Sequence, residues 1–233
     1  MSNEAVVRLL GATTAFRALD SDDLSALAAT AQVRRFGAGE HVFTRGDVGG
    51  GMFVVASGSV ALVVNAASGN EVVLAVLSSP ASFGEMAVID GGPRVATALV
   101  RVPSVLVALP RPEVQRVLRA HPAVSLAMLS LLSGIVRSVD EHVADLVLLD
   151  LAGRVAKLLL AATVRPGVPP AGDGAVAVSL TLSQSELARI VGGSRQQVNR
   201  ILGEFADAGA ILRSGARITA VRPDRLSLWL DAP

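Results

Sequence analysis

Two hydrophobic patterns occupy the first half of the chain. Residues 5–32 show the spacing of short helices. From Val33 to about Leu109, short valine-rich runs alternate with turns that contain glycine, among them Ser57-Gly58 and Ser68-Gly69. Strands at such regular spacing are typical of a sandwich or barrel. We therefore expect short helices followed by an all-β domain.

A long helix is predicted next, from Pro112 to Leu149. Its apolar residues recur alternately three and four positions apart, as in the seam of a coiled coil. One alternative is that the helix packs only on its own domain, but further apolar residues beside the seam make the stripe wide. We therefore expect it to contact both the β domain and a second copy of the chain. The seam consists of Leu129, Leu132, Val136, Val139, Val143 and Leu146.

The pattern from Ser183 to Leu202 predicts two short helices joined by a tight turn. Ser183 with Glu186, and Ser194 with Gln197, match the capping box that begins a helix. Gly192-Gly193 would end the first helix, because glycine tolerates the left-handed backbone of a C-terminal cap. The exposed face of the second helix would carry Arg195, Gln196, Asn199 and Arg200.

These side chains are suited to reading base edges. Arginine can pair with both acceptors of guanine, and glutamine or asparagine can pair with adenine. The pair of helices is therefore interpreted as a helix-turn-helix, the alternative being an ordinary helical hairpin with a polar outer face. A hairpin that turns at Ser214-Gly215 would form a wing, and a strand over Ala175–Leu180 would lead into the motif.

Composition excludes several kinds of chemistry. The chain has no cysteine, which rules out disulfides, thiolate nucleophiles and cysteine-ligated metal sites. Its three histidines lack a metal-binding spacing, and no nucleophile is matched with a base, so we expect neither a metal site nor an enzyme. We also expect no secretory signal and no apolar run of membrane-spanning length, and hence a cytoplasmic protein that binds no membrane.

Charge is distributed unevenly, although the net charge is only +1. Residues 1–150 carry 11 basic and 14 acidic side chains, whereas residues 151–233 carry 10 basic and 6 acidic ones. The positive excess therefore lies with the predicted helix-turn-helix, where attraction to phosphates requires it.

A second informative run covers residues 83–98. It predicts a helical turn that opens at Gly84-Glu85, followed by a loop and by Arg94 at the entry to a strand. Backbone N–H groups at such a turn can cradle an anion, and the planar fork of an arginine can neutralise a phosphate. Taken alone, Glu85 and Arg94 are better explained as a surface ion pair.

Taken together, four motifs in this order resemble the cyclic-AMP receptor protein (Crp–Fnr) family of bacterial transcription regulators. They are Met52–Val60, the run 83–98, Leu149–Arg154 and the helix-turn-helix. The resemblance implies an α+β fold with an N-terminal double-stranded β-helix (jelly-roll) cyclic-nucleotide-binding domain, a long dimerisation helix and a C-terminal winged helix-turn-helix. The expected boundaries are 1–110, 111–149 and 150–233.

The resemblance also implies the ligand and DNA sites. Glu85 would bind a ribose hydroxyl and Arg94 a cyclic phosphate, with backbone N–H groups near Gly84 and Ala96. No cofactor is expected, and the allosteric ligand would be a cyclic nucleotide, cAMP first among them. The ligand-binding residues would be Gly84, Glu85, Met86, Arg94, Val95, Ala96, Val139 and Asp140. The DNA-binding residues would be Ser183, Gln184, Ser194, Arg195, Gln196, Gln197, Asn199, Arg200, Arg213 and Arg217.

Four positions depart from the family pattern. Val95 stands where cyclic-AMP binders carry serine or threonine, and Val139-Asp140 stand where a Thr-Ser pair contacts adenine. Valine makes no hydrogen bond, and an ionised aspartate only accepts. Gln196 replaces a glutamate between the two reading arginines, so the base preference at that step should shift or relax.

We therefore expect a homodimeric DNA-binding transcription regulator that recognises a near-palindromic site. The ligand would bias a hinge near Leu149-Asp150 by a population shift. The loop 165–174 matches a family surface that touches RNA polymerase. The alternatives are a regulator that responds to a cyclic dinucleotide or to no ligand, and a cyclic-nucleotide-binding protein that acts on a protein partner.

Overall fold

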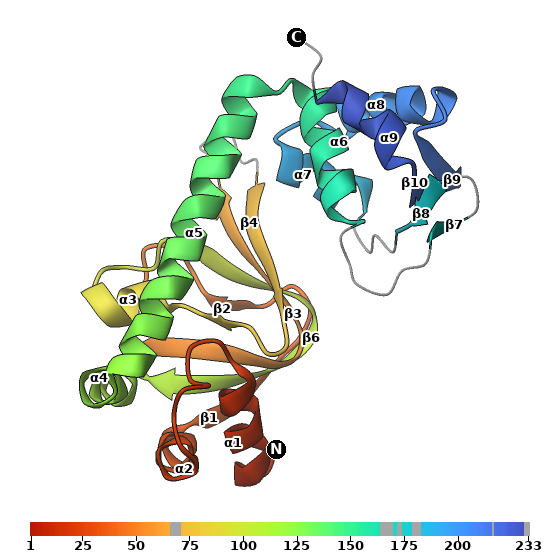
Figure 1. The fold of residues 1–233 in the computed structure, drawn as a ribbon. Coiled ribbons are helices and arrows are strands. Elements are labelled where there is room, and N and C mark those ends of the chain that lie inside the picture. The colour runs from red at the N-terminus through yellow and green to blue at the C-terminus, as the bar shows by residue number, and fades with distance from the viewer. Residues whose placement is uncertain (66–70, 164–169, 172–173, 179–182, 216, 231–233) are drawn as a thin grey trace. The chain divides into compact units, whose positions relative to one another are not determined.

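The computed structural model in Figure 1 describes residues 1–65, 71–163, 170–171, 174–178, 183–215 and 217–230. The chain divides into two compact units, Met1–Arg137 and Ser138–Pro233. Each unit has a hydrophobic core of its own. The expected order of a β domain, a long helix and a helix-turn-helix is confirmed.

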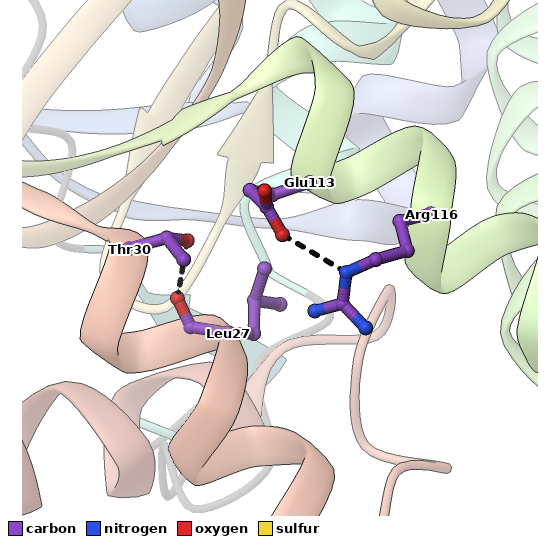
Figure 2. A network of polar contacts seen from close by, with 4 residues as sticks. All are labelled: Leu27, Thr30, Glu113 and Arg116. Atoms are coloured by element: carbon purple, nitrogen blue, oxygen red, sulfur yellow. Dashed lines mark hydrogen bonds and ion pairs between the residues drawn. The ribbon is translucent and has the colours of Figure 1, made fainter.

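Helices α1 (Asn3–Ala12) and α2 (Ser21–Thr30) open the first unit. Asp20 caps α2 by accepting from two backbone N–H groups of its first turn. Figure 2 shows α2 beside the later helix α4 (Arg111–Ala120), where Thr30 donates to the Leu27 carbonyl and Arg116 donates to Glu113. Each polar pair lies within a single helix, Thr30 with Leu27 in α2 and Arg116 with Glu113 in α4, so neither pair joins the two helices. Leu27 is fully buried, so apolar packing accounts for the association of the two helices.

Six strands form one antiparallel sheet with the order β1-β6-β3-β4, with β2 on β6 and β5 on β3. Register shifts along the ladder of the two long strands bend them, and a second buried cluster, including Phe53 and Phe83, lies among the strands. The strands are β1 (Gln32–Phe36), β2 (His41–Phe43), β3 (Gly51–Asn65), β4 (Glu71–Ser78), β5 (Ser82–Phe83) and β6 (Thr97–Pro110).

The turn predicted at Ser57-Gly58 is wrong, because both residues lie inside β3. Gly58 has φ +89° at a register shift, and a Cβ there would stand 2.6 Å from the Pro103 carbonyl oxygen and 2.7 Å from Ser104 Cα. Glycine is therefore required by the close approach of β6 and by the backbone bulge, not by a chain reversal. The turn predicted at Ser68-Gly69 lies outside the described residues.

The predicted long helix is divided in two. Helix α4 ends at Ala120, and α5 (Pro122–Leu148) begins two residues later. The ring of Pro122 disfavours a helical backbone at the preceding residue, and His121 is accordingly extended, with φ −123° and ψ 91°. Val124 and Met128, near the start of α5, are buried in the core of the first unit.

Beyond Met128, the apolar side of α5 is largely exposed in a single chain. By length and composition alone, α5 is the one helix among the described residues that could cross a membrane, with a mean hydropathy of 1.6 over 18 residues. The expectation that no run reaches this length is therefore wrong. Serine and glycine residues interrupt the apolar sequence, but the mean hydropathy of the helix stays high. The exposed residues include Leu129, Val136, Val139, Val143 and Leu146.

The second unit continues with α6 (Leu151–Ala161), α7 (Gln184–Val191) and α8 (Arg195–Asp207), followed by α9 (Pro223–Leu226) and a short 3-10 helix, η2 (Ser227–Trp229). Its sheet has the order β7-β8-β10-β9. The strands are β7 (Pro170–Ala171), β8 (Ala175–Ala177), β9 (Ile211–Ser214) and β10 (Arg217–Val221). Most of the loop 165–174 and the end of the strand predicted over 175–180 lie outside the described residues.

Candidate functional site

Gly84 joins β5 to the short helix α3 (Glu85–Asp90) with a left-handed backbone, φ 83° and ψ 14°. A Cβ at this position would lie 2.6 Å from Arg94 Nη1. Glycine is therefore needed both for the backbone angle and for the space that the arginine occupies. The structure thus brings Gly84 and Arg94 into direct contact, although a loop separates them in the sequence.

Arg94 is 5% exposed and is held on two sides. Its Nη1 donates to the Gly84 carbonyl at 2.8 Å, and its Nη2 donates to the carbonyl of Gly51 at the start of β3. The guanidinium carbon lies 4.1 Å from the ring centroid of Phe43. Nε is buried and has no hydrogen-bond partner among the described residues. A buried cation with an unused donor is suited to an anionic ligand.

Glu85 is 6% exposed and begins α3. Burial raises the pKa of its carboxyl, and a backbone hydrogen bond and the charge of Arg94 oppose this shift. Burial likewise lowers the pKa of Arg94, against the attraction of Glu85 and Asp47. The two side chains are therefore a buried, oppositely charged pair, and the alternative of a surface ion pair is wrong.

The other predicted ligand residues differ in exposure. Met86 on α3 is exposed, Val95 is 54% exposed, and Ala96 is buried. Thr97, which carries a hydroxyl two residues beyond Val95, accepts from the backbone N–H of Arg45 at 3.0 Å. This bond uses the hydroxyl only as an acceptor, so its O–H group remains able to donate.

Val139 and Asp140 lie on α5 within the second unit, and both are exposed. Glu85 and Arg94 belong to the first unit. A shared ligand site between these two pairs of residues stays a prediction.

The helix-turn-helix is built by local caps. Ser183 accepts from the backbone N–H of Glu186, whose carboxylate accepts in return, and Ser194 and Gln197 form the same reciprocal pair. Gly192 ends α7 in the left-handed region, with φ 71°. Both predicted capping boxes and the glycine cap are therefore present.

Helix α8 buries one face and exposes the other. Val198, Ile201, Leu202 and Phe205 are buried, while Arg195, Gln196 and Arg200 are exposed and Asn199 is partly exposed. Arg200 Nε lies 3.8 Å from Glu204, a carboxylate on the same exposed face. Ser183 and Gln184 lie at the start of α7, and Arg213 and Arg217 lie on the wing strands. Their contacts with DNA stay predictions.

The predicted hinge at Leu149-Asp150 is the joint between α5 and α6. Asp150 caps α6 by accepting from the Gly153 N–H at 2.7 Å. Arg154 Nη1 donates to the Leu149 carbonyl at 2.8 Å, and Nε donates to the Val191 carbonyl at the end of α7 at 2.9 Å. One side chain thus ties the joint to the helix-turn-helix.

A second contact crosses the same joint. Lys157 Nζ lies 2.6 Å from Asp145 Oδ1 on the last turns of α5. Sequence reasoning did not assign a role to Lys157 or to Phe43. The signal that could have pointed to these two residues is the rarity of their residue types, since Lys157 is the chain's one lysine and Phe43 is one of six phenylalanines.

Comparison with known proteins matches both units. Residues 33–121 match the cyclic nucleotide-binding domain, and residues 153–229 match the Crp-like helix-turn-helix domain. A "CRP-like cAMP-activated global transcriptional regulator" of Mycobacterium tuberculosis is 31% identical over 91% of this chain and 94% of its own. The "Cyclic AMP receptor protein" of Thermus thermophilus is also 31% identical, over 89% of this chain and 91% of its own.

A solved structure supports the fold. The c-di-GMP-responsive global regulator CLP of Xanthomonas campestris superposes with a TM-score of 0.74 at 24% identity, over 87% of this chain and 99% of that one. The two domain matches and the end-to-end similarity to curated regulators lead to one conclusion: the chain belongs to the Crp–Fnr family of transcription regulators, with an N-terminal cyclic-nucleotide-binding domain and a C-terminal Crp-like helix-turn-helix.

Proposed function

We propose that this regulator is a cytoplasmic homodimer whose binding to DNA is controlled by a cyclic nucleotide, with cAMP the first candidate. The observation that carries this proposal is the buried Glu85–Arg94 pair with an unused Arg94 Nε. A cyclic phosphate would supply the missing acceptor, and a ribose hydroxyl would donate to the carboxylate of Glu85. The chain would act by binding alone, as a regulator and not as an enzyme.

The identity of the nucleotide is a separate part of the proposal. The Mycobacterium relative is named as cAMP-activated, whereas the CLP regulator of Xanthomonas campestris is named as c-di-GMP-responsive. Family membership is therefore compatible with different ligands. Val95 and Val139 lack the hydroxyls expected of cAMP binders. These two positions favour the second candidate, a regulator that responds to a cyclic dinucleotide or to no ligand.

Calorimetry of the purified protein against cAMP, cGMP and cyclic dinucleotides tests the ligand. We expect cAMP to bind and Arg94→Ala to abolish binding, because a charge-assisted bidentate contact is lost and the phosphate has no counter-charge. Arg45→Ala is the matched control, since Arg45 is an exposed arginine near the same site. Binding of a cyclic dinucleotide in place of cAMP would transfer the proposal to the second candidate.

The proposed dimer forms along the exposed stripe of α5. A dimer would explain why α5 has an exposed apolar surface although its first turns are already packed on the β domain. The proposed domains are 1–110, 111–149 and 150–233, and the paired reading helices would enter successive major grooves about 34 Å apart. RNA polymerase is proposed as a further partner.

A gel shift on promoter DNA with and without the ligand tests regulation. Specific DNA binding that strengthens with ligand supports the proposal. A protein that binds cAMP but no DNA would instead favour a regulatory protein acting on a protein partner.

A further inference from the structure

The chain concentrates its few aromatic rings around one arginine. Only 3% of its residues are aromatic, and six of them are phenylalanine. Three of the six, Phe43, Phe53 and Phe83, form one cluster with ring centroids 5.5–5.9 Å apart. Alanine, valine and leucine fill most of the remaining core. Half of the chain's phenylalanines therefore lie in this one cluster.

The three rings stand in different relations to Arg94. The guanidinium carbon lies 4.1 Å from the centroid of Phe43 and 5.9 Å from that of Phe53. Phe83 belongs to the same cluster and is fully buried, yet it has no such contact with the cation. A cation within about 6 Å of a ring face is attracted by the ring quadrupole, and the attraction grows when water is excluded. Of the two rings within this range, Phe43 is the nearer and should attract Arg94 more strongly.

The contacts of Arg94 leave little freedom to its plane. Two of its five N–H groups donate to the Gly84 and Gly51 carbonyls, and its guanidinium carbon lies over the Phe43 ring. The missing Cβ of Gly84 gives the guanidinium its space, since an added Cβ would stand 2.6 Å from Arg94 Nη1. The carbonyls set the direction of two N–H groups, while the buried Nε remains available.

We propose that Phe43 is a positioning residue of the ligand site, which holds the Arg94 guanidinium in the plane that meets the anionic phosphate of the ligand. This inference rests on the proposed binding of a cyclic nucleotide. An aliphatic side chain in its place fills part of the volume but has no quadrupole, so the cation gains rotational freedom that binding must then remove. Phe43 is only partly buried, so a larger ring can replace it.

The affinity for cAMP, measured by calorimetry, tests the proposal. Phe43→Leu is expected to weaken binding by about 5- to 30-fold, the range that corresponds to losing a partly desolvated cation–π contact. Phe43→Tyr should restore affinity because it retains the ring face. Phe83→Leu is the matched control, since it removes a ring of the same cluster. It should lower thermal stability more than Phe43→Leu does, and leave the affinity unchanged.

A spectroscopic measurement needs no ligand and separates this inference from the proposed function. In protein with isotope-labelled arginine, the Nε–H proton of Arg94 should be ring-shifted and slow to exchange. The shift should disappear in Phe43→Leu and persist in Phe83→Leu. If wild-type protein does not bind cAMP but shows this signal, the proposed ligand fails and the positioning of Arg94 stands.

Three results would overturn the inference. One is an unshifted Nε–H signal in the wild-type protein, which decides the matter even if Phe43→Leu does not fold. Another is an unchanged cAMP affinity in a folded Phe43→Leu protein. The third is an equal loss of affinity in Phe43→Leu and Phe83→Leu, because the rings would then matter only as general packing of the barrel.

Discussion

At the scale of single residues, the proposed ligand site depends on buried charge. Glu85 and Arg94 are each almost enclosed. Burial raises the pKa of Glu85 and lowers the pKa of Arg94, so it favours the neutral form of each group. Burial of an ionisable group is costly unless partners compensate for lost water. Glu85 and Arg94 compensate each other in part, and the Gly84 and Gly51 carbonyls serve Arg94. The remaining cost is consistent with a site that is completed by its ligand.

The raised pKa of Glu85 predicts a pH dependence of stability. Between the ordinary value of 4.5 and the raised value, the folded protein retains a proton that the unfolded chain has lost. The free energy of unfolding should therefore fall as pH rises through this window. Glu85→Gln should remove that decline and stabilise the ligand-free protein at neutral pH. Urea denaturation from pH 4 to pH 8 checks this, and an equally steep decline in the variant would contradict it.

Restoring the hydroxyl at position 95 should tighten ligand binding. Val95 is half exposed, so serine there costs little packing and can donate to a phosphate oxygen. We expect Val95→Ser to lower the Kd for cAMP by about 2- to 10-fold, the contribution of one hydrogen bond. Val95→Ala is the control and should not tighten binding. Calorimetry in which serine and alanine behave alike would exclude a phosphate contact at this position.

Arg195 should read a base. It is exposed in the first turn of α8 and makes no hydrogen bond or ion pair with the described residues. Arg195→Ala should cost about 1–3 kcal/mol on specific DNA and relax the preference at one step of each half-site. Fluorescence anisotropy with specific and random duplexes checks this. Equal losses on both duplexes would make Arg195 a phosphate contact.

At the scale of elements, local caps explain why the helix-turn-helix was predictable. Each capping box joins residues three positions apart, so the sequence carries the complete signal. The break between α4 and α5 follows from Pro122 in the same local way. The long strands were harder to predict. From the sequence alone, Ser57-Gly58 is consistent with a chain reversal. In the structure, Gly58 lies instead at a bulge of β3, where β6 approaches closely.

The cap of the reading helix should contribute measurably to the stability of the second unit. Ser194→Ala should lower its free energy of unfolding by about 0.5–2 kcal/mol. Trp229, the chain's one tryptophan, packs on Phe205 of α8 with ring centroids 4.7 Å apart, so its fluorescence reports on this unit. Ser130→Ala is the control, because Ser130 bonds back to the Leu126 carbonyl within α5. Equal shifts of the fluorescence transition in both variants would contradict the role of the cap.

At the scale of the whole molecule, α5 belongs to both units. Val124 and Met128 are buried in the first unit, whereas Asp145 is paired with Lys157 in the second. Between these anchors, the apolar stripe is exposed. A helix anchored at both ends, with an apolar surface between, is suited to pairing with a second copy and to transmitting a change from one unit to the other.

Pairing along α5 predicts that one charge will disrupt the dimer. Val136→Asp would place two like charges in the apolar seam, so light scattering should show a monomer or an unfolded protein. Ser130→Asp is the matched control, because it adds the same charge to α5 outside the seam. A wild-type protein that is monomeric at micromolar concentration would remove the dimer from the proposal.

The amino-acid sequence by itself determined the order of the domains, the helix boundaries set by caps and prolines, and the wing. These features depend on residues close together in the chain, where periodicity and capping act. The tertiary structure decided the surroundings of Arg94. Its partners at Phe43, Gly51 and Gly84 come from separate strands and a loop. No local pattern encodes which carbonyl or ring will meet an arginine, because that choice depends on how the strands pack around it.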